Sequence, residues 1–477
     1  MRRLAALLAL AVAFAGCAAP AEDALAPADA GADALAGARV VIAHVDTGIN
    51  PYSLAFRDES PLAWVHPSRY LPGYPEDAPA LRLSLNETDY AKAYEADKAV
   101  WDSVERDRLY WIPGTRIVGA VSFGPGGTNC PPAATPPLSY VPGDCADRPI
   151  LDDHGHGTMT ASRMASREGS LAPDARIVTV EGPGAHAVRW LADQGWIDAQ
   201  TNSWLDFVPP PASDAVDGIS EAFAHAASRM AVFAASGNGA GYVLGFAPTP
   251  TYVLDTAAPG VVLVGAHDNG RVAPWSGAPA HVLADGFGGL SAAVDSVDAF
   301  GPTPVSCCTS AASPYAAGGA AAMILAAREI LGDPLTGVRD GVLAQGPEGL
   351  VAGGPLADGD LTLDELRDLV TKTATARPAQ GPHDGDMHWG SQGAPPSPTN
   401  PAGNPYCLGC WGTPIAFSQV PEGVPLVAHA GYGSVDPLSL DLALQVLRGE
   451  MPLPERATED AFFALDAQAR AAIFGSL

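Results

Sequence analysis

The chain has 477 residues, of which 47% are hydrophobic, so it can bury a sizeable core in one large or two ordinary domains. Its formal net charge is −27, which argues against a nucleic-acid binder because such proteins present a basic face to the phosphates. Only 17% of the residues are charged, so the composition is not that of a disordered acidic chain.

The N-terminal 37 residues are predicted to direct export. Two arginines follow Met1, and residues 4–15 form an apolar run that is too short to span a bilayer. The run ends in Phe-Ala-Gly-Cys at 14–17, which resembles the lipobox of bacterial lipoproteins and implies a signal peptide at 1–16 and a lipid on Cys17. An ordinary secretory signal cut at a nearby Ala-x-Ala site is the alternative. Residues 17–37 are rich in Ala, Pro and Asp and predict a flexible tether. We therefore expect a protein of the bacterial cell envelope or a secreted one.

Nearly continuous apolar runs predict strands that are buried on both faces, and they lie at 38–45, 175–180, 231–235 and 261–265. Helical patterns lie between or after them, at 157–166, 186–194, 214–229 and 313–331. Strands that alternate with helices predict an α/β fold with a mainly parallel sheet.

Two stretches interrupt this alternation. Residues 52–150 are rich in Pro, Tyr and charges, with a helical pattern at 87–108, and residues 375–430 are rich in Gly and Pro. We expect both to be insertions in a domain that covers 38–440. Residues 441–477 are expected to form a helical extension, with a helix at 459–474.

Six cysteines follow Cys17, and an even number in an exported protein predicts disulfides. Cys130 and Cys145 bracket one loop, and Cys407 and Cys410 lie close enough in sequence to pair with each other. The partners of the adjacent residues 307 and 308 stay open.

Four motifs carry candidate catalytic side chains. Asp46 follows the first predicted strand, at the end where α/β sheets place their sites. His156 opens a predicted helix and can act as a general base. Asn238 follows another buried strand and can donate to an oxyanion, and Ser310 precedes an apolar helix whose positive end stabilises negative charge. Taken singly, each has a simpler interpretation as a turn residue, a surface histidine or a helix cap.

Together and in this order, the motifs resemble the catalytic set of the subtilisin-like (subtilase) serine peptidases. Asp-Thr-Gly stands at 46–48, His-Gly-Thr at 156–158, Asn-Gly at 238–239 and Thr-Ser-Ala-Ala-Ser-Pro at 309–314. The order Asp, His, Ser is that of subtilisin. The resemblance implies a three-layer fold over roughly 38–440, in which helices flank a mainly parallel central sheet.

The resemblance also implies a serine endopeptidase. Ser310 would be the nucleophile, His156 its general base, and Asp46 the acid that orients the imidazole. Asn238 and the backbone N–H of Ser310 would bind the tetrahedral oxyanion. We expect polypeptide substrates, no nucleic-acid partner, a monomer, and membrane attachment only through the lipid on Cys17. No cofactor is expected for catalysis. Family members often hold structural calcium, for which the acidic loop 384–386 is an unspecific candidate.

The chain departs from the family pattern in two places. Cys308 stands where the family has glycine before Thr-Ser, and Trp204-Leu205 stands where the family has Leu-Gly after a serine. The substrate cleft is therefore expected to be altered on its non-primed side. The residues expected to line the cleft are Ser203, Trp204, Ala234, Ala235, Ser236 and Gly237.

Two other classes of function remain as alternatives. One is a binding or scaffold protein of the cell envelope with a degenerate peptidase fold, which the departure at residue 308 favours and the retained motifs oppose. The other is a metal-dependent hydrolase, for which His383, His388, Cys407 and Cys410 supply a set of tetrahedral ligands.

Overall fold

The computed structural model describes residues 40–124, 148–204, 213–237, 258–301 with short gaps, 308–331, 342–345, 356, 360–375 and 431–454. The predictions for residues 1–37 and Cys17 and for the helix at 459–474 lie outside the described residues, as does the insertion expected at 375–430 apart from its first residue.

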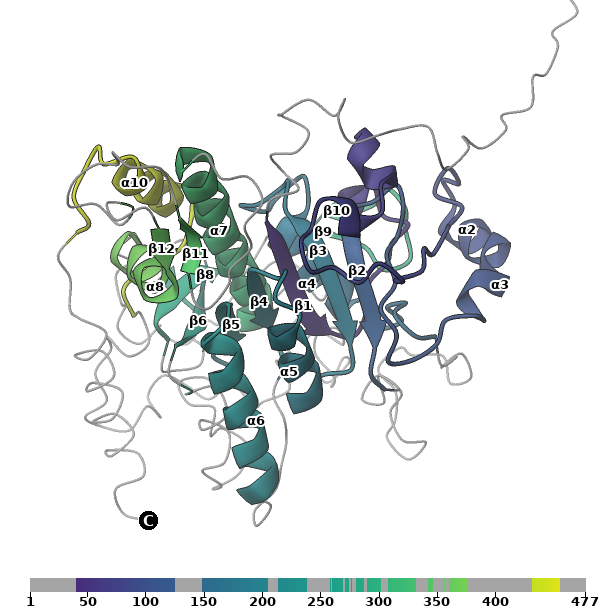
Figure 1. Cartoon of the computed structure of the whole chain (residues 1–477), viewed down its shortest axis with the longest axis horizontal. Coiled ribbons are helices and arrows are strands. Elements are labelled where there is room, and N and C mark those ends of the chain that lie inside the picture. Colours follow the sequence, from purple (N-terminus) through teal and green to yellow (C-terminus); the bar gives the residue numbers. More distant parts are fainter. Residues whose placement is uncertain are drawn as a thin grey trace, which may run out of the picture.

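Seven parallel strands form the central sheet (Figure 1). In spatial order they are β2 Ile117–Ser122, β3 Arg176–Glu181, β1 Val41–Asp46, β4 Ala199–Asn202, β5 Ala231–Ala235, β6 Val261–Asp268 and β8 Val282–Asp285. A two-residue strand, β7 (Arg271–Val272), pairs with β6 in the antiparallel sense. The predicted α/β fold with a mainly parallel sheet is confirmed.

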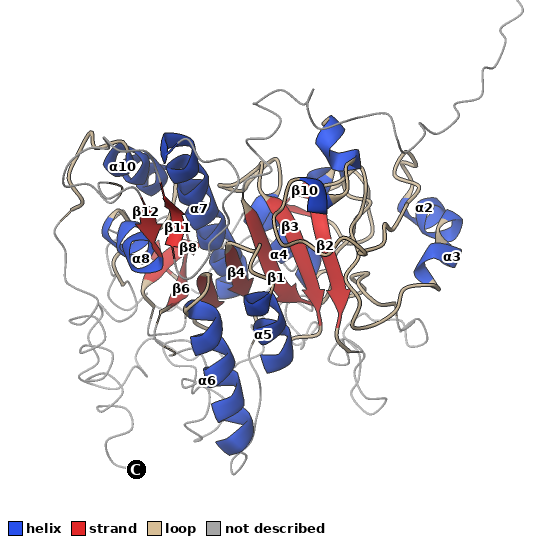
Figure 2. Ribbon diagram, viewed as in Figure 1, coloured by secondary structure: helices blue, strands red, loops and turns tan. Residues whose placement is uncertain are grey.

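Helices cover both faces of the sheet and make three layers (Figure 2). One face packs against α4 (His156–Ala165) and α7 (Cys308–Leu331), and the other packs against α5 (Ala185–Asp193) and α6 (Ser213–Ala227). Successive residues of a strand point to opposite faces, so Val41, Ala43 and Val45 of β1 join one core and Ile42 joins the other. Burial on both faces explains why the strand reads as a continuous apolar run.

The order of the strands puts β1, the first described strand, in the interior of the sheet. β1 pairs with β3 on one side and with β4 on the other. After β1 the chain forms the edge strand β2 and then β3 on the first side, and it then crosses to β4 and continues outward on the second side. The carboxyl ends of β1 and β4 therefore lie at a topological switch point, which is where open α/β sheets form their sites.

Two segments differ from the expectation. β2 lies inside the stretch expected to be an insertion, yet its six buried residues form an edge strand of the central sheet. The helix expected at 87–108 is shorter and divided into α2 (Tyr90–Ala96) and α3 (Lys98–Trp101). The break falls at Asp97, whose buried carboxylate accepts hydrogen bonds from the Tyr52 hydroxyl at 2.9 Å and from the Ser84 backbone at 2.6 Å.

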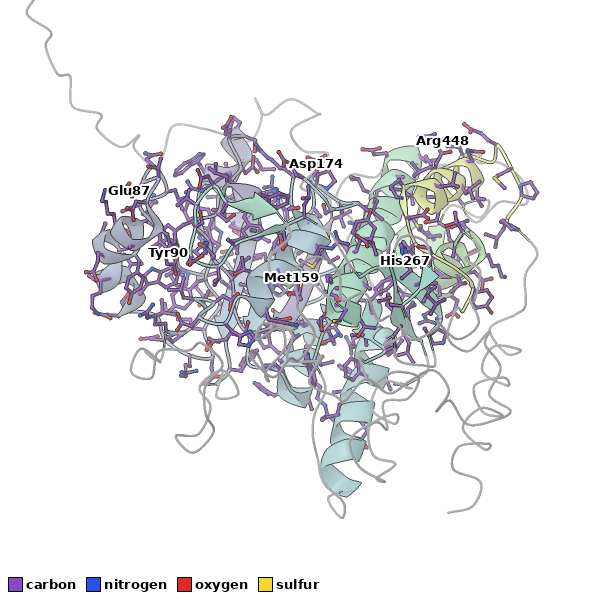
Figure 3. All side chains as sticks on the ribbon, turned by 180° about the vertical axis from the view of Figure 1, so that it is seen from behind. Glu87, Tyr90, Met159, Asp174, His267 and Arg448 are labelled. Carbon is purple, nitrogen blue, oxygen red and sulfur yellow. The ribbon has the colours of Figure 1, made fainter. Side chains whose placement is uncertain are left out.

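The remaining elements pack around this frame (Figure 3). They are the short helices Leu54–Phe56, Pro61–Trp64 and Pro67–Arg69, the helices α8 Leu363–Lys372 and α10 Pro437–Leu447, and the strand pairs β9 Ser291–Ala292 with β10 Phe300–Gly301 and β11 Val342–Gln345 with β12 Asp360–Thr362. Helix α10 begins before the expected boundary at residue 441 and packs against α7. Among the described residues, none of the helices combines the length and apolarity needed to cross a bilayer.

A buried ion pair ties α7 to the sheet. Arg328, near the end of α7, and Asp198, just before β4, are each 2% exposed. The second oxygen of the same carboxylate accepts the backbone N–H of Val41 at 2.8 Å. The pair thus fixes the C-terminal end of α7 against the starts of β1 and β4. The N-terminal end of α7, which carries Ser310, is therefore held at the carboxyl ends of these strands.

Candidate active site

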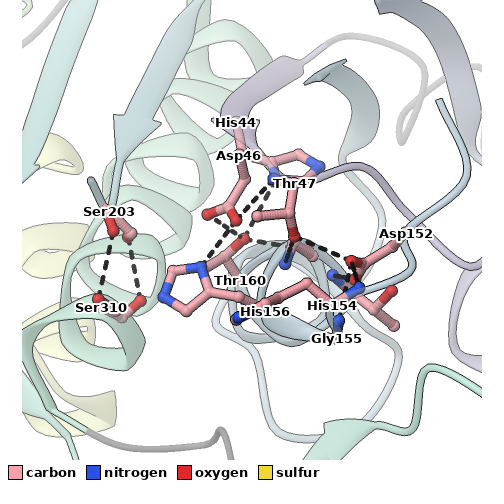
Figure 4. Close-up of polar contacts among 12 residues, drawn as sticks. His44, Asp46, Thr47, Asp152, His154, Gly155, His156, Thr160, Ser203 and Ser310 are labelled. Atoms are coloured by element: carbon pink, nitrogen blue, oxygen red, sulfur yellow. Dashed lines mark hydrogen bonds and ion pairs between the residues drawn. The ribbon is translucent and has the colours of Figure 1, made fainter. Parts of the chain in front are cut away.

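Three elements bring the candidate catalytic side chains together (Figure 4). Asp46 is the last residue of β1, His156 is the first residue of α4, and Ser310 lies in the first turn of α7. The Nδ1 atom of His156 lies 2.7 Å from Oδ1 of Asp46. A carboxylate only accepts hydrogen bonds, so Nδ1 carries the proton and, in the neutral ring, Nε2 does not. Figure 4 shows that second nitrogen turned toward Ser310.

The charges of this pair stabilise each other. Burial disfavours a charged imidazole, but the charge and hydrogen bond of Asp46, together with the charge of Asp152, outweigh burial and raise the pKa of His156 above its usual value. Burial also opposes the charge on Asp46, yet the charge of His156 and its hydrogen bond hold the pKa of Asp46 below the usual range. A buried carboxylate of this kind fixes the imidazole in one tautomer and stabilises its cation.

The competing histidine of the motif, His154, has a different environment. Its ring centre lies 6.1 Å from that of His156, and its Nδ1 atom is buried without a partner among the described residues. Burial and the neighbouring imidazole lower the pKa of His154. The contact with Asp46 is therefore made by His156.

Glycines allow the two motifs to meet. A Cβ atom on Gly157 would lie 2.1 Å from the carbonyl oxygen of Gly48, closer than real Cβ atoms approach. Gly48 itself has a φ of +112°, a conformation that glycine adopts without strain. The Thr47 hydroxyl completes the junction because it accepts the N–H of Gly157 at 2.8 Å. The Asp-Thr-Gly and His-Gly-Thr motifs are thus two halves of one contact.

Asp152 is a site residue that the sequence motifs did not predict. Its buried carboxylate accepts the backbone N–H groups of His154, Gly155 and Thr158 at 2.7–3.0 Å, and also the hydroxyl of Thr47 at 2.9 Å. It satisfies free donors at the start of α4 and so fixes the helix end that carries the imidazole. The available signal was an aspartate pair a few residues before a predicted helix start.

Ser310 and Ser203 are joined by two hydrogen bonds. The hydroxyl of Ser310 donates to the carbonyl of Ser203 at 3.3 Å, and the hydroxyl of Ser203 donates to the carbonyl of Ser310 at 3.0 Å. The second bond has a clear cause. Pro314, four residues further along α7, has no N–H, so the carbonyl of Ser310 lacks the usual helical partner. The end of β4 supplies the replacement donor.

Cys308 begins α7 in an unusual conformation. Its φ is +77°, in the left-handed region that favours glycine, which is the residue that the family motif has at this position. The residue is 2% exposed and disulfide-bonded, and its N–H donates to the carbonyl of Gly286 at 2.7 Å. A cysteine can therefore replace the glycine here, but its backbone is strained.

The residues expected to line the substrate cleft lie at the carboxyl ends of β4 and β5. Ala234 and Ala235 end β5, Ser236 donates its N–H to the carbonyl of Val264, and Gly237 has a φ of +91°. The ring of Trp204 packs on Phe223 of α6, with the ring centres 5.9 Å apart. Asn238 lies outside the described residues, and the contacts of all these residues with a substrate stay a prediction.

The model of the family described as "Subtilase family" matches residues 37–385, well over half of the chain. The chain belongs to the subtilase family. Among solved structures, this subtilase is similar to a lanthipeptide protease at 15% identity, with a TM-score of 0.44 and coverage of 86% of this chain and 87% of the other. It is also similar to the epidermin leader peptide processing serine protease from Staphylococcus aureus at 13% identity, with a TM-score of 0.45 and coverage of 88% and 77%. No curated protein matches this subtilase.

The described part of this subtilase contains no group of three or more His, Cys, Asp or Glu side chains arranged to hold a metal ion. The alternative metal ligands, which are His383, His388, Cys407 and Cys410, lie outside the described residues, as does the acidic loop 384–386.

Proposed function

We propose that this subtilase is a serine endopeptidase that uses Asp46, His156 and Ser310 as its catalytic triad. One observation carries the proposal: the bond between Asp46 and Nδ1 of His156 leaves Nε2 without a proton and turned toward Ser310 (Figure 4). That arrangement is what a general base for a hydroxyl nucleophile requires.

In this mechanism, the hydroxyl of Ser310 leaves the carbonyl of Ser203 and turns to Nε2 of His156. It attacks the peptide carbonyl as Nε2 takes its proton, and Asp46 stabilises the imidazolium that forms. The backbone N–H of Ser310 and the side chain of Asn238 bind the oxyanion. The imidazolium then gives its proton to the leaving amine, and water hydrolyses the acyl-enzyme by the same route.

Polypeptides are the proposed substrates. Ser203 and Trp204 follow β4, and residues 234–237 end β5, so the two segments would flank an extended peptide on either side of Ser310. We propose that the chain acts outside the cytoplasm, held by a lipid on Cys17 and the tether at 17–37. Labelling with a radioactive fatty acid, compared between the unmodified chain and Cys17→Ala, tests the anchor.

A fluorophosphonate probe tests the catalytic role. The unmodified protein should be labelled and should cleave members of a peptide library, whereas Ser310→Ala should do neither. Cleavage that survives Ser310→Ala would reject Ser310 as nucleophile. If the unmodified protein is neither labelled nor active, the alternative of a scaffold with a peptidase fold is favoured. Activity should persist in a chelator, because no metal takes part in these steps.

A further inference from the structure

A second polar pair lies directly behind the pair of Asp46 and His156. His44 stands two residues before Asp46 on β1, and Thr160 stands four residues after His156 on α4. Residues two apart on a strand and four apart on a helix share a face and are both separated by about 6–7 Å. The two pairs therefore lie next to each other: Asp46 contacts His156, and His44 contacts Thr160 (Figure 4).

Each oxygen of Asp46 has its own donors. Oδ1 accepts from His156 at 2.7 Å and from the N–H of Thr47 at 2.8 Å. Oδ2 accepts from the hydroxyl of Thr160 at 3.0 Å, and among the described residues this is its only donor. The orientation of the carboxylate toward His156 thus depends on Thr160 as well as on the backbone.

The number of available protons decides which atom donates in the contact between His44 and Thr160. The Thr160 hydroxyl has one hydrogen and three neighbours, which are Oδ2 of Asp46 at 3.0 Å, the carbonyl of Gly157 at 3.0 Å and Nδ1 of His44 at 3.1 Å. The first two atoms only accept, so the hydrogen points to them and the contact with His44 must run the other way. Nδ1 of His44 donates to Thr160, and Nε2 carries no proton.

The surroundings of His44 agree with this neutral form. The side chain is fully buried, and its Nε2 atom has no partner among the described residues. Burial lowers the pKa of His44 to about 4, against the opposing charges of Asp46 and Asp152. A permanently neutral imidazole can serve as a fixed donor across the working pH range of a peptidase.

We propose that His44 and Thr160 are positioning residues of the catalytic site: His44 fixes the direction of the Thr160 hydroxyl, and Thr160 holds Asp46 for His156. The proposal rests on the proposed function, because it assigns a role in supporting that triad. Neither residue touches the substrate, so the pair acts on turnover and not on binding.

The test uses the full chain and a peptide substrate cleaved through Ser310. Thr160→Val keeps the shape of the side chain and removes the hydroxyl, so we expect kcat to fall on the order of tenfold with KM unchanged. The acid limb of kcat/KM should move to higher pH, because a carboxylate with one donor fewer attracts the imidazolium proton more strongly. Thr160→Ser should restore most of the rate. An unchanged kcat and an unchanged acid limb in Thr160→Val would overturn the proposal.

His44 is tested through its coupling to Thr160. His44→Leu should lower kcat, and His44→Asn, whose amide nitrogen replaces Nδ1 as the donor, should recover part of it. The double variant with Thr160→Val should be no slower than Thr160→Val alone, because both changes cut the same chain of hydrogen bonds. A double variant whose loss of kcat equals the combined losses of the two single variants would contradict this chain of hydrogen bonds.

A measurement on the unmodified chain decides the question even if a variant fails to fold. Nitrogen-15 NMR of labelled histidines reports which ring nitrogen carries the proton. The signal of His44 is assigned by its loss in His44→Asn or in His44→Leu, and it should show the proton on Nδ1 at neutral pH. A proton on Nε2 would overturn the proposal. Cleavage that survives Ser310→Ala would instead reject the proposed function, whatever the state of His44.

Discussion

Replacing Asp46 with asparagine separates the charge of this residue from its hydrogen-bond geometry. The Oδ1 position faces two donors, the N–H of Thr47 and Nδ1 of His156, so the oxygen of an asparagine must take that place. The amide nitrogen then takes the Oδ2 position, facing the hydroxyl of Thr160. That hydroxyl can accept it and donate to the carbonyl of Gly157, 3.0 Å away. Asp46→Asn should therefore keep the tautomer of His156 and lose only the charge.

The size of the loss follows from Coulomb's law. Two unit charges with centres about 4 Å apart, at an effective dielectric constant of about 20, attract by about 4 kcal/mol. The imidazolium that forms in the transition state loses this attraction, so kcat should fall on the order of a thousandfold. Asp46→Ala removes the acceptor as well and leaves the tautomer unfixed, so its loss should be larger, on the order of ten thousandfold.

The pH profile gives an independent readout. His156 acts as a base only when it is neutral, so the raised pKa of His156 places the acid limb of kcat/KM above about pH 6.5, the usual value for histidine. Without the charge of Asp46 the limb should move to lower pH. Both variants are assayed from pH 5 to 9 with Ser310→Ala as background and with melting curves as a check on folding. Equal losses in the asparagine and alanine variants, or an acid limb that stays in place, would refute the reasoning.

Two further substitutions test the frame that holds the site, each with a matched control. Gly157→Ala should abolish peptide cleavage because its Cβ atom would lie 2.1 Å from a carbonyl oxygen. The control is Gly218→Ala, whose Cβ atom would have no neighbour within 4 Å, so this variant should stay active and its melting temperature should rise. An active Gly157→Ala would contradict the close approach. Arg328→Ala leaves the carboxylate of Asp198 buried and unpaired, so denaturant unfolding should show a loss of about 3–5 kcal/mol. Arg189→Ala, which breaks an exposed pair, should cost less than about 1 kcal/mol, and similar losses in the two variants would show that burial does not decide the effect.

The sequence predicted the strands whose residues are apolar on both faces. β1, β3, β5 and β6 all contain such runs, and the structure confirms them. It did not predict β4, whose residues are Ala, Gln, Thr and Asn. These residues form a strand because β1 and β5 supply hydrogen-bonding partners on both sides, and a propensity read from sequence does not include that contribution.

For the site, the sequence by itself determined which residue types stand in which order, because motifs such as Asp-Thr-Gly and His-Gly-Thr are short and their glycines are required locally. Only the tertiary structure decided what surrounds them. Asp46 and Thr160 are 114 residues apart, and Ser203 and Ser310 are 107 apart. No local pattern marks His44 as the neighbour of Thr160, since a histidine in an apolar strand has no sequence signature of its partner. The order of the strands and the packing of α4 and α7 on one face set these distances, and they bring the motifs of Asp46, His156 and Ser310 into one site.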